Sequence, residues 1–249
     1  NIPIKRLIIV DGFSTDGTLE IVKNFCSKNK VELVLIYSAG TRAVARQRAI
    51  EAVETEWFMF VDSDVLLCNG WMKMVEKYLK DESVGALHGI DIPVDRDIKD
   101  FSEAMARLRK ILRRPPKEHP SVKRGFTGDV LIRTSVVKDI RIPSFLHYYE
   151  DKYIQRHVLG KGYKWLVTQE PYCYHHKAMS RVLKDALPSG YFEGKMGYVP
   201  IRKSVIAMFT IFPKALYAYL LKRNFSMVKN QIKFQVLYTI GVLKSRFSP

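Results

Sequence analysis

Short apolar runs rich in β-branched and aromatic residues alternate with helix-patterned stretches through the first two thirds of the chain. This alternation leaves few folds open, because strands separated by helices pair as a parallel sheet with helices on its faces. We therefore expect an α/β fold with a Rossmann-like, mostly parallel sheet flanked by helices. The expected strands are residues 6–10, 31–37, 57–61, 84–90 and 164–167. The expected helices are one that begins at Asp16-Gly17-Thr18, then residues 41–53, 71–79, 101–114 and 149–159, and a polar loop is expected at 117–128.

The chain changes character after residue 177, where basic and apolar residues become mixed. Of the net charge of +16, a share of +10 comes from residues 195–249, which hold ten Lys or Arg and no Asp or Glu. Residues 204–221 carry one charge, Lys214, and approach the length of a membrane span, but we expect Pro213 to break the helix in the middle. Residues 225–247 place lysines among large apolar side chains. We therefore expect an α/β domain at 1–177 and a basic, amphipathic, membrane-associating helical region at 178–249, lying at an anionic headgroup surface.

Charge and cysteine usage bear on the partners and the compartment. A strongly basic chain can bind nucleic acid, but the sequence contains no recognisable nucleic-acid-binding motif, so we expect no such partner. Cys26, Cys68 and Cys173 are far apart without CxxC spacing, and we expect them to be reduced core residues. Nothing at the beginning of the sequence resembles a secretory signal. These features lead us to expect a cytoplasmic protein, peripheral to the inner face of the cell membrane.

The sequence Asp62-Ser63-Asp64 follows directly on an expected apolar strand. In open α/β sheets, ligands bind outside the carboxyl ends of the strands. Two carboxylates at such a place form an oxygen site suited to Mg²⁺ or Mn²⁺, with phosphate oxygens completing the shell. A lone motif of this length recurs freely and is often only a solvated acidic loop, so its meaning depends on the rest of the chain.

Three further motifs accompany this acid pair in a fixed order. Val10-Asp11-Gly12-Phe13-Ser14-Thr15-Asp16-Gly17-Thr18 comes first, Ala45-Arg46-Gln47 precedes the acid pair, and Glu150-Asp151 follows it. Over residues 4–176 this order resembles the family-two glycosyltransferases of the A-type fold. The resemblance implies an inverting, metal-dependent hexosyltransferase, which moves a sugar from a UDP- or GDP-linked donor to a lipid-linked or glycan acceptor. Residues 1–177 would then be the nucleotide-sugar-binding catalytic domain.

The resemblance also implies roles for individual residues in donor binding. Asp11 would contact the nucleotide base, with Ser14 in the same turn, and Arg46 would brace the site near the diphosphate. Asp62 would face the ribose or the donor sugar, with Ser63 beside it, and Asp64 would ligate the metal. From the residues alone, Asp11 could also be only a turn former, and Arg46 could equally be a surface charge of its helix.

The pair Glu150-Asp151 and the pair His175-His176 supply the remaining candidates. Acids are favoured at a helix N-terminus for electrostatic reasons alone; the resemblance implies in addition that Asp151 is the general base and Glu150 its support. If the acceptor is a lipid phosphate, its oxygen is already ionised and a base is unnecessary. A histidine near the end of a strand can ligate Mn²⁺, and adjacent residues on an extended segment point to opposite sides, so at most one of these two faces the site. Counted together, the metal candidates are Asp62, Asp64, His175 and His176.

The sequence departs from the family pattern in two places. Gly12 stands where the family has a second turn aspartate, and Gln47 stands where it has asparagine. The family's first strand, with its own turn, has no counterpart here, so either the sequence is part of a longer protein or one wall of the base site is built differently. Two rival functions stay open: a nucleotidyltransferase of related fold, and a non-catalytic basic protein that binds membranes or nucleic acid.

Overall fold

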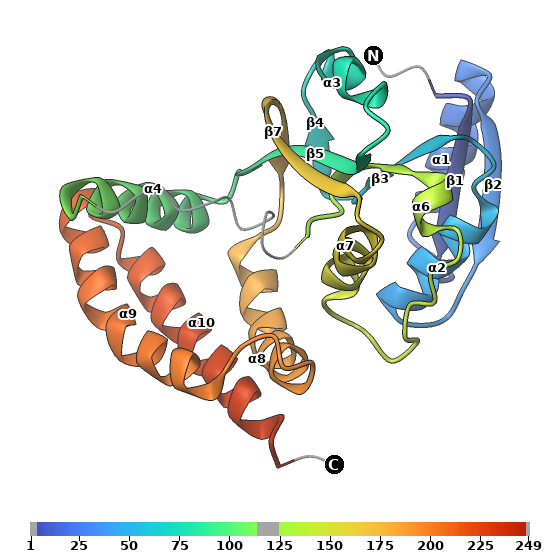
Figure 1. The fold of residues 1–249 in the computed structure, drawn as a ribbon. Coiled ribbons are helices and arrows are strands. Elements are labelled where there is room, and N and C mark those ends of the chain that lie inside the picture. Colours follow the sequence, from blue (N-terminus) through green and yellow to red (C-terminus); the bar gives the residue numbers. More distant parts are fainter. Residues whose placement is uncertain (1–3, 114–124, 248–249) are drawn as a thin grey trace. The chain divides into compact units, whose positions relative to one another are not determined.

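The computed structural model describes residues 4–113 and 125–247 (Figure 1). Most of the expected polar loop at 117–128 lies outside the described residues. The chain forms two compact units. Among the described residues, unit 1 consists of 4–62, 67–90 and 125–171, and unit 2 consists of 63–66, 91–113 and 172–247.

Unit 1 begins with a parallel pair of strands joined by a helix. Strand β1 (Arg6–Asp11) pairs with β2 (Glu32–Tyr37), and helix α1 (Thr18–Asn29) connects them. Gly17 precedes α1 with φ 85°, a left-handed conformation that glycine adopts without steric penalty. Helix α2 (Arg42–Ala52) follows, and the Thr41 side chain caps it by accepting a hydrogen bond from the Val44 amide at 3.3 Å.

The other strands form a five-stranded sheet in the order β3-β6-β5-β7-β4. These strands are β3 (Trp57–Val61), β4 (Val65–Leu67), β5 (Val84–Pro93), β6 (Asp129–Arg133) and β7 (Lys164–His175). Strand β6 runs antiparallel to both β3 and β5, so the sheet is mixed and the expectation of a mostly parallel sheet is corrected. The cause is β6 itself, which the sequence analysis did not predict: a short buried apolar run carries no signal of its direction.

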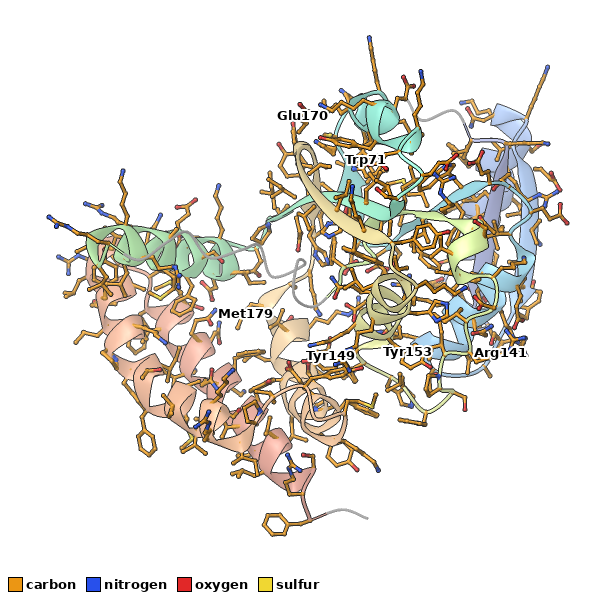
Figure 2. All side chains as sticks on the ribbon, in the orientation of Figure 1. Trp71, Arg141, Tyr149, Tyr153, Glu170 and Met179 are labelled. Carbon is orange, nitrogen blue, oxygen red and sulfur yellow. The ribbon has the colours of Figure 1, made fainter. Side chains whose placement is uncertain are left out.

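The core of unit 1 lies between the sheet and its helices. Helices α3 (Trp71–Leu79), α6 (Thr134–Val137) and α7 (Glu150–Gly160) belong to this unit. Trp71, labelled in Figure 2, is fully buried. Its indole N–H donates to the buried Asp129 carboxylate at 3.0 Å. Other fully buried side chains of this core are Ile50, Val75, Leu87, Ile132, Leu146 and Ile154.

Unit 2 is mainly helical. Its helices are α4 (Arg96–Ile111), α8 (Met179–Lys195), α9 (Ile201–Lys222) and α10 (Phe225–Lys244). Helix α8 lies within the region 178–249 that was expected to be helical, although its bounds were not predicted. It packs along α10 so closely that a Cβ atom on Gly190 or Gly241 would overlap the backbone of the other helix. Helix α9 passes through Pro213 without ending, which corrects the expected break. Pro213 is exposed, and the packing of the buried residues Ile211 and Ala215 on either side of it stabilises the helix across this position.

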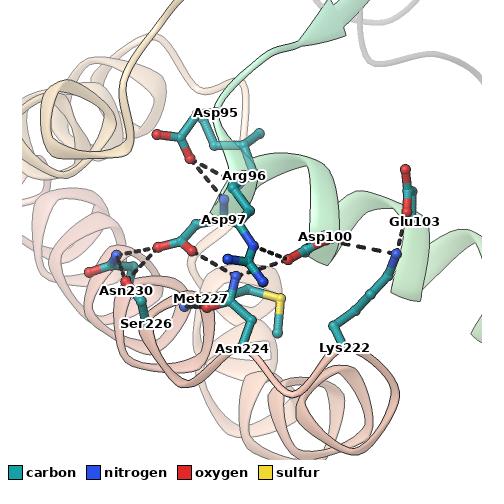
Figure 3. Close-up of polar contacts among 11 residues, drawn as sticks. Asp95, Arg96, Asp97, Asp100, Glu103, Lys222, Asn224, Ser226, Met227 and Asn230 are labelled. Atoms are coloured by element: carbon teal, nitrogen blue, oxygen red, sulfur yellow. Dashed lines mark hydrogen bonds and ion pairs between the residues drawn. The ribbon is translucent and has the colours of Figure 1, made fainter.

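A network of polar side chains joins the start of α4 to the turn between α9 and α10 (Figure 3). The Asp97 carboxylate accepts hydrogen bonds from Asn224 at 2.9 Å, Ser226 at 2.8 Å and Asn230 at 2.7 Å. Burial works against the ionised form of Asp97, but these three donors outweigh it and lower its pKa. Deeper along the same helices, Ala104, Ala218 and Met227 form a fully buried cluster. Helices α4, α9 and α10 therefore form one packed group. The three cysteines are buried and form no disulfide.

Candidate active site

The turn after β1 is held by its own acidic side chains. Asp11 is 5% exposed, and its carboxylate accepts a hydrogen bond from the Ser14 amide at 2.8 Å. Hydrogen bonds from the Ser14 side chain and amide lower the pKa of Asp11, so this carboxylate is ionised at neutral pH. Asp16 accepts from the amide and hydroxyl of Thr18 at 3.1 and 2.6 Å, which starts α1. The Ser14 side chain is exposed at this turn.

Two aromatic rings lie next to this turn. Neither was among the site residues expected from the sequence. Phe13 has φ 67°, a left-handed conformation that is strained for a bulky residue. Its ring stacks on that of Tyr37 at the end of β2, with centroids 5.6 Å apart. Both rings are exposed, 58% for Phe13 and 45% for Tyr37. In the sequence, the large aromatic Phe13 stands out within a turn of Gly, Ser and Asp, and this could have identified it as a candidate site residue. Together the rings offer a flat face on which a planar group can stack.

Arg46 on α2 joins two acids that are far apart in the sequence. Its Nη2 atom lies 2.8 Å from Oδ1 of Asp62, and its Nε atom lies 3.3 Å from Oε1 of Glu150. The guanidinium also lies over the Phe60 ring, 4.6 Å from the centroid. The side chains of Arg46 and Glu150 are only 14% and 6% exposed, whereas that of Asp62 is 37% exposed. The contacts of Arg46 are thus with the first acid of the Asp62-Ser63-Asp64 motif and with the Glu150-Asp151 pair.

Electrostatics keep Arg46 charged in this position. Burial alone would lower the pKa of the guanidinium, and this is the largest single effect. The carboxylates of Asp62, Glu150 and Asp151 outweigh it, so the net shift of the Arg46 pKa is upward. Because Asp62 and Glu150 both pair with this one buried cation, Arg46 fixes the position of each carboxylate relative to the other.

Helix α7 presents the Glu150-Asp151 pair from a buried first turn. Tyr149, just before the helix, is buried with φ 68°, another strained left-handed residue (Figure 2). Glu150 and Asp151 are 4% and 9% exposed, and Asp151 Oδ1 accepts from the Lys152 amide at 2.7 Å. A helix-terminal acid that serves only the helix dipole has no need of burial. The burial of both acids therefore favours a role beyond capping.

In unit 2, the second acid of the motif lies next to a histidine. His175 Nε2 is 3.5 Å from Oδ1 of Asp64, and His175 Nδ1 is 3.3 Å from the Asp91 carboxylate. Arg181 approaches Asp64 from the beginning of α8, with 3.8 Å between Nη1 and Oδ2. His176 contributes its backbone amide, which donates to the Asp64 carbonyl at 2.8 Å, while its side chain is exposed. Asp91 and Arg181 were not among the site residues expected from the sequence.

Asp64 and His175 are suited to a divalent cation in their chemistry. A metal-bound histidine usually donates its second ring N–H to a carboxylate, which is the relation of Nδ1 to Asp91. Nε2, on the side of Asp64, is then the atom available for a metal, and Mn²⁺ accepts imidazole together with carboxylate. Within residues 4–113 and 125–247 no three His, Cys, Asp or Glu side chains form a complete metal site. A cation held here would need further oxygen ligands, such as donor phosphates.

The predicted residues therefore fall into two groups. Unit 1 brings together Arg46, Asp62 and Glu150, with Asp151 next in the chain; unit 2 brings together Asp64 and His175. The exposed Ser63 is the single residue between Asp62 and Asp64.

Comparison with known proteins relates this arrangement to a family. The family model described as Glycosyl transferase family 2 matches residues 1–141. In fold, the chain is similar to the mannosyltransferase PcManGT from Pyrobaculum calidifontis, solved in complex with GDP-Man and Mn²⁺. The TM-score is 0.60 at 14% sequence identity, over 97% of this chain and 78% of that one. It is also similar to S. aureus TarS 1–349 in complex with UDP-GlcNAc, with a TM-score of 0.51 at 16% identity over 98% and 83% of the two chains.

No curated protein matches the sequence. At identities of 14% and 16% the structural likeness shows a shared fold, and the family model, which covers more than half of the chain, shows the family. This chain belongs to glycosyl transferase family 2 and has an A-type α/β fold.

Proposed function

We propose that this chain catalyses the inverting transfer of a sugar from a UDP- or GDP-linked donor to a lipid-linked or glycan acceptor, with Mn²⁺ or Mg²⁺ as cofactor. Membership of the family supports glycosyl transfer, and two proteins of similar fold were solved with GDP-Man and with UDP-GlcNAc. The observation that carries the proposal is the contact of Arg46 with both Asp62 and Glu150, at 2.8 and 3.3 Å. It joins the expected donor-binding acid to the acid pair expected to act on the acceptor.

Inversion requires the acceptor oxygen to attack the anomeric carbon from the side opposite the leaving group. As the new carbon–oxygen bond forms, the bond from the anomeric carbon to the diphosphate oxygen breaks, and its electron pair leaves with the nucleoside diphosphate. A hydroxyl acceptor must also lose its proton. Following the family resemblance, we assign Asp151 as the base that takes it and Glu150, which Arg46 holds at 3.3 Å, as its support. A positioned general base contributes typically about 10²–10⁴-fold to the rate.

Donor binding is assigned to the turn after β1 and to the acid motif. Asp11, ionised and nearly buried, is the candidate for the nucleotide base, with Ser14 beside it. Asp62 presents a partly exposed carboxylate, held by Arg46, to the ribose or the donor sugar. These groups are positioned before any ligand binds, which reduces the entropy lost when the donor is ordered.

The cofactor is assigned to Asp64 and His175. A bound Mn²⁺ or Mg²⁺ supplies positive charge that stabilises the departing diphosphate. Asp91 positions the His175 ring through Nδ1, at 3.3 Å. The Arg181 guanidinium, 3.8 Å from the Asp64 carboxylate, would add its positive charge to that of the bound cation.

A nucleotide-release screen tests the proposal directly. The purified chain is incubated with UDP- and GDP-sugars, with Mn²⁺ or Mg²⁺, and with a polyprenyl phosphate or a glycan acceptor. We expect metal-dependent release of UDP or GDP that one acceptor class increases, and a product of inverted anomeric configuration by NMR. The absence of release from all donors, together with pyrophosphate formation from a nucleoside triphosphate and a sugar phosphate, would refute the proposal in favour of a nucleotidyltransferase.

A further inference from the structure

Helix α9 turns an apolar face outward. Five large apolar side chains recur along it at spacings of three or four residues, so they lie on one side of the helix. They are Ile206, Phe209, Phe212, Leu216 and Leu220, each between 52% and 67% exposed. We call these five residues the α9 stripe. A contiguous exposed apolar surface of this kind marks an interaction site in a folded protein.

The opposite face of α9 is already occupied within unit 2. Its buried residues are Ser204, Ile211, Ala215 and Ala218. Ala218 packs with Ala104 of α4 and Met227 of α10 in a fully buried cluster. The rotation of α9 about its axis is therefore set by this packing, and the α9 stripe cannot turn inward without breaking it.

The charges around the stripe indicate what covers it. Arg202 and Lys203 are exposed at the first turn of α9, and Arg223 and Lys229 are exposed beyond its end. Residues 195–249 contain no Asp or Glu at all. Apolar side chains bordered by cations, in a segment without acids, match the boundary between acyl chains and anionic headgroups better than they match a protein partner of mixed charge.

We propose that the α9 stripe is a membrane-docking face, on which α9 lies in the plane of an anionic bilayer with the stripe among the headgroups and upper acyl chains. This site is separate from the donor and acid groups of the proposed function, so either proposal can fail alone. Docking there would hold the enzyme at the surface where a lipid-linked acceptor is found.

The packing of α9 also decides between lying on the membrane and crossing it. Among the described residues, α9 is the one helix long and apolar enough to span a bilayer. However, Lys222 of α9 forms ion pairs with Asp100 and Glu103 of α4, and Asn224 donates to Asp97. If α9 crossed the bilayer as part of this packed group, α10, which packs along it, would carry the exposed Lys229 and Lys233 into the hydrocarbon, where a charged side chain is unfavourable. A surface orientation leaves them in water.

The experiment measures flotation of the full chain with two kinds of vesicle, phosphatidylcholine alone and phosphatidylcholine with phosphatidylglycerol. The test variant is Phe209→Ser/Leu216→Ser. Its matched control is Ile21→Ser/Phe25→Ser on α1, which removes one large aliphatic and one aromatic side chain that are 70% and 50% exposed. Both variants should fold, because all four side chains are exposed; thermal unfolding checks this. We expect the stripe variant to lose at least tenfold in binding to anionic vesicles and the control to bind like the wild type.

Two further measurements complete the test: binding of charge-reversal variants, and extraction of the bound protein with alkaline carbonate. Arg202→Glu/Lys203→Glu should weaken binding to anionic vesicles by more than tenfold, since each basic residue contributes about fivefold. Lys23→Glu/Lys28→Glu on α1 changes the net charge equally and should weaken it far less. Alkaline carbonate should release the bound protein, and retention after carbonate would overturn the surface orientation. Three results would overturn the docking face: no binding by the wild type, equal binding by the stripe variant, or a stripe variant whose only change is from dimer to monomer.

Discussion

Removal of the Arg46 guanidinium tests the geometry that joins Asp62 to Glu150. In Arg46→Ala, the Glu150 carboxylate stays in place with a side chain only 6% exposed and loses its cation, which lies 3.3 Å away in the native protein. Asp62 also loses its partner, but its side chain is 37% exposed and water can replace the lost contact. The loss of stability should therefore arise mainly from Glu150.

The expected magnitude follows from this difference in burial. Breaking a buried ion pair by removing one partner costs about 3–5 kcal/mol, because the remaining charge is uncompensated. An exposed pair contributes about 0–1 kcal/mol, so Asp62 adds little. We take the lower end, about 3 kcal/mol, because a truncated arginine leaves room for water beside Glu150. For a domain of this size that corresponds to a decrease in Tm of about 6–12 °C.

Urea and thermal unfolding of four proteins measure this effect: wild type, Arg46→Ala, Glu150→Gln and the double variant. The double variant should be more stable than Arg46→Ala by at least ~1 kcal/mol, since the uncompensated charge is gone. Arg48→Ala is the matched control on the same helix. Arg48 is exposed and donates to the Tyr37 carbonyl at 2.8 Å, and its removal should change stability by less than ~1 kcal/mol. Equal destabilisation by Arg46→Ala and Arg48→Ala, or no recovery in the double variant, would refute the reasoning.

Three further predictions concern the cofactor, the base and the helical unit. Asp64→Ala should abolish metal-dependent nucleotide release, and full activity of the wild type in EDTA would contradict this. Asp151→Asn should slow transfer to a hydroxyl acceptor by at least ~10² while leaving donor binding by calorimetry unchanged; unimpaired transfer to that acceptor would show that Asp151 is structural. The pKa of Asp97 is lowered by its three donors, so it stabilises the fold above the ordinary carboxyl pKa of 3.8, and this contribution is lost as the pH falls through the lower folded-state value. The difference in free energy of unfolding between wild type and Asp97→Ala should therefore be constant near neutral pH and shrink below about pH 4; a difference that grows in acid would contradict it.

Local sequence patterns predicted many of the elements. The expected helix at 71–79 is α3 (Trp71–Leu79), and the expected strand at 57–61 is β3 (Trp57–Val61). Such elements are specified by periodicity and by capping residues close in the sequence, as with Thr41 before α2. The bounds of helix α8 within the expected helical region were not predicted, because it contains Pro188 and two glycines, which are poor helix formers. Its close packing on α10 overrides their propensity.

In the candidate site, the sequence likewise predicted individual residues but not the contacts between them. The order of four motifs predicted Asp62, Asp64 and the Glu150-Asp151 pair as functional acids. The motifs could not predict that Arg46 holds Asp62 and Glu150, which lie 16 and 104 residues away in the sequence. Nor could they predict Asp91 as the partner of His175, 84 residues distant. Contacts between residues so far apart leave no local pattern in a single sequence.

The sequence by itself determined the class of fold, the acids of the candidate site and the basic, apolar character of the C-terminal region. Only the tertiary structure decided the direction of β6, the partners of Arg46 and the outward face of α9. In each case the deciding contacts are between residues far apart in the sequence, and α9 illustrates this. Periodicity shows which residues of an element are apolar, but α9 is apolar on both sides, and so its sequence alone does not say which side is buried. That choice is made by the neighbours, when Ala218 packs against Ala104 and Met227 and leaves the α9 stripe outside.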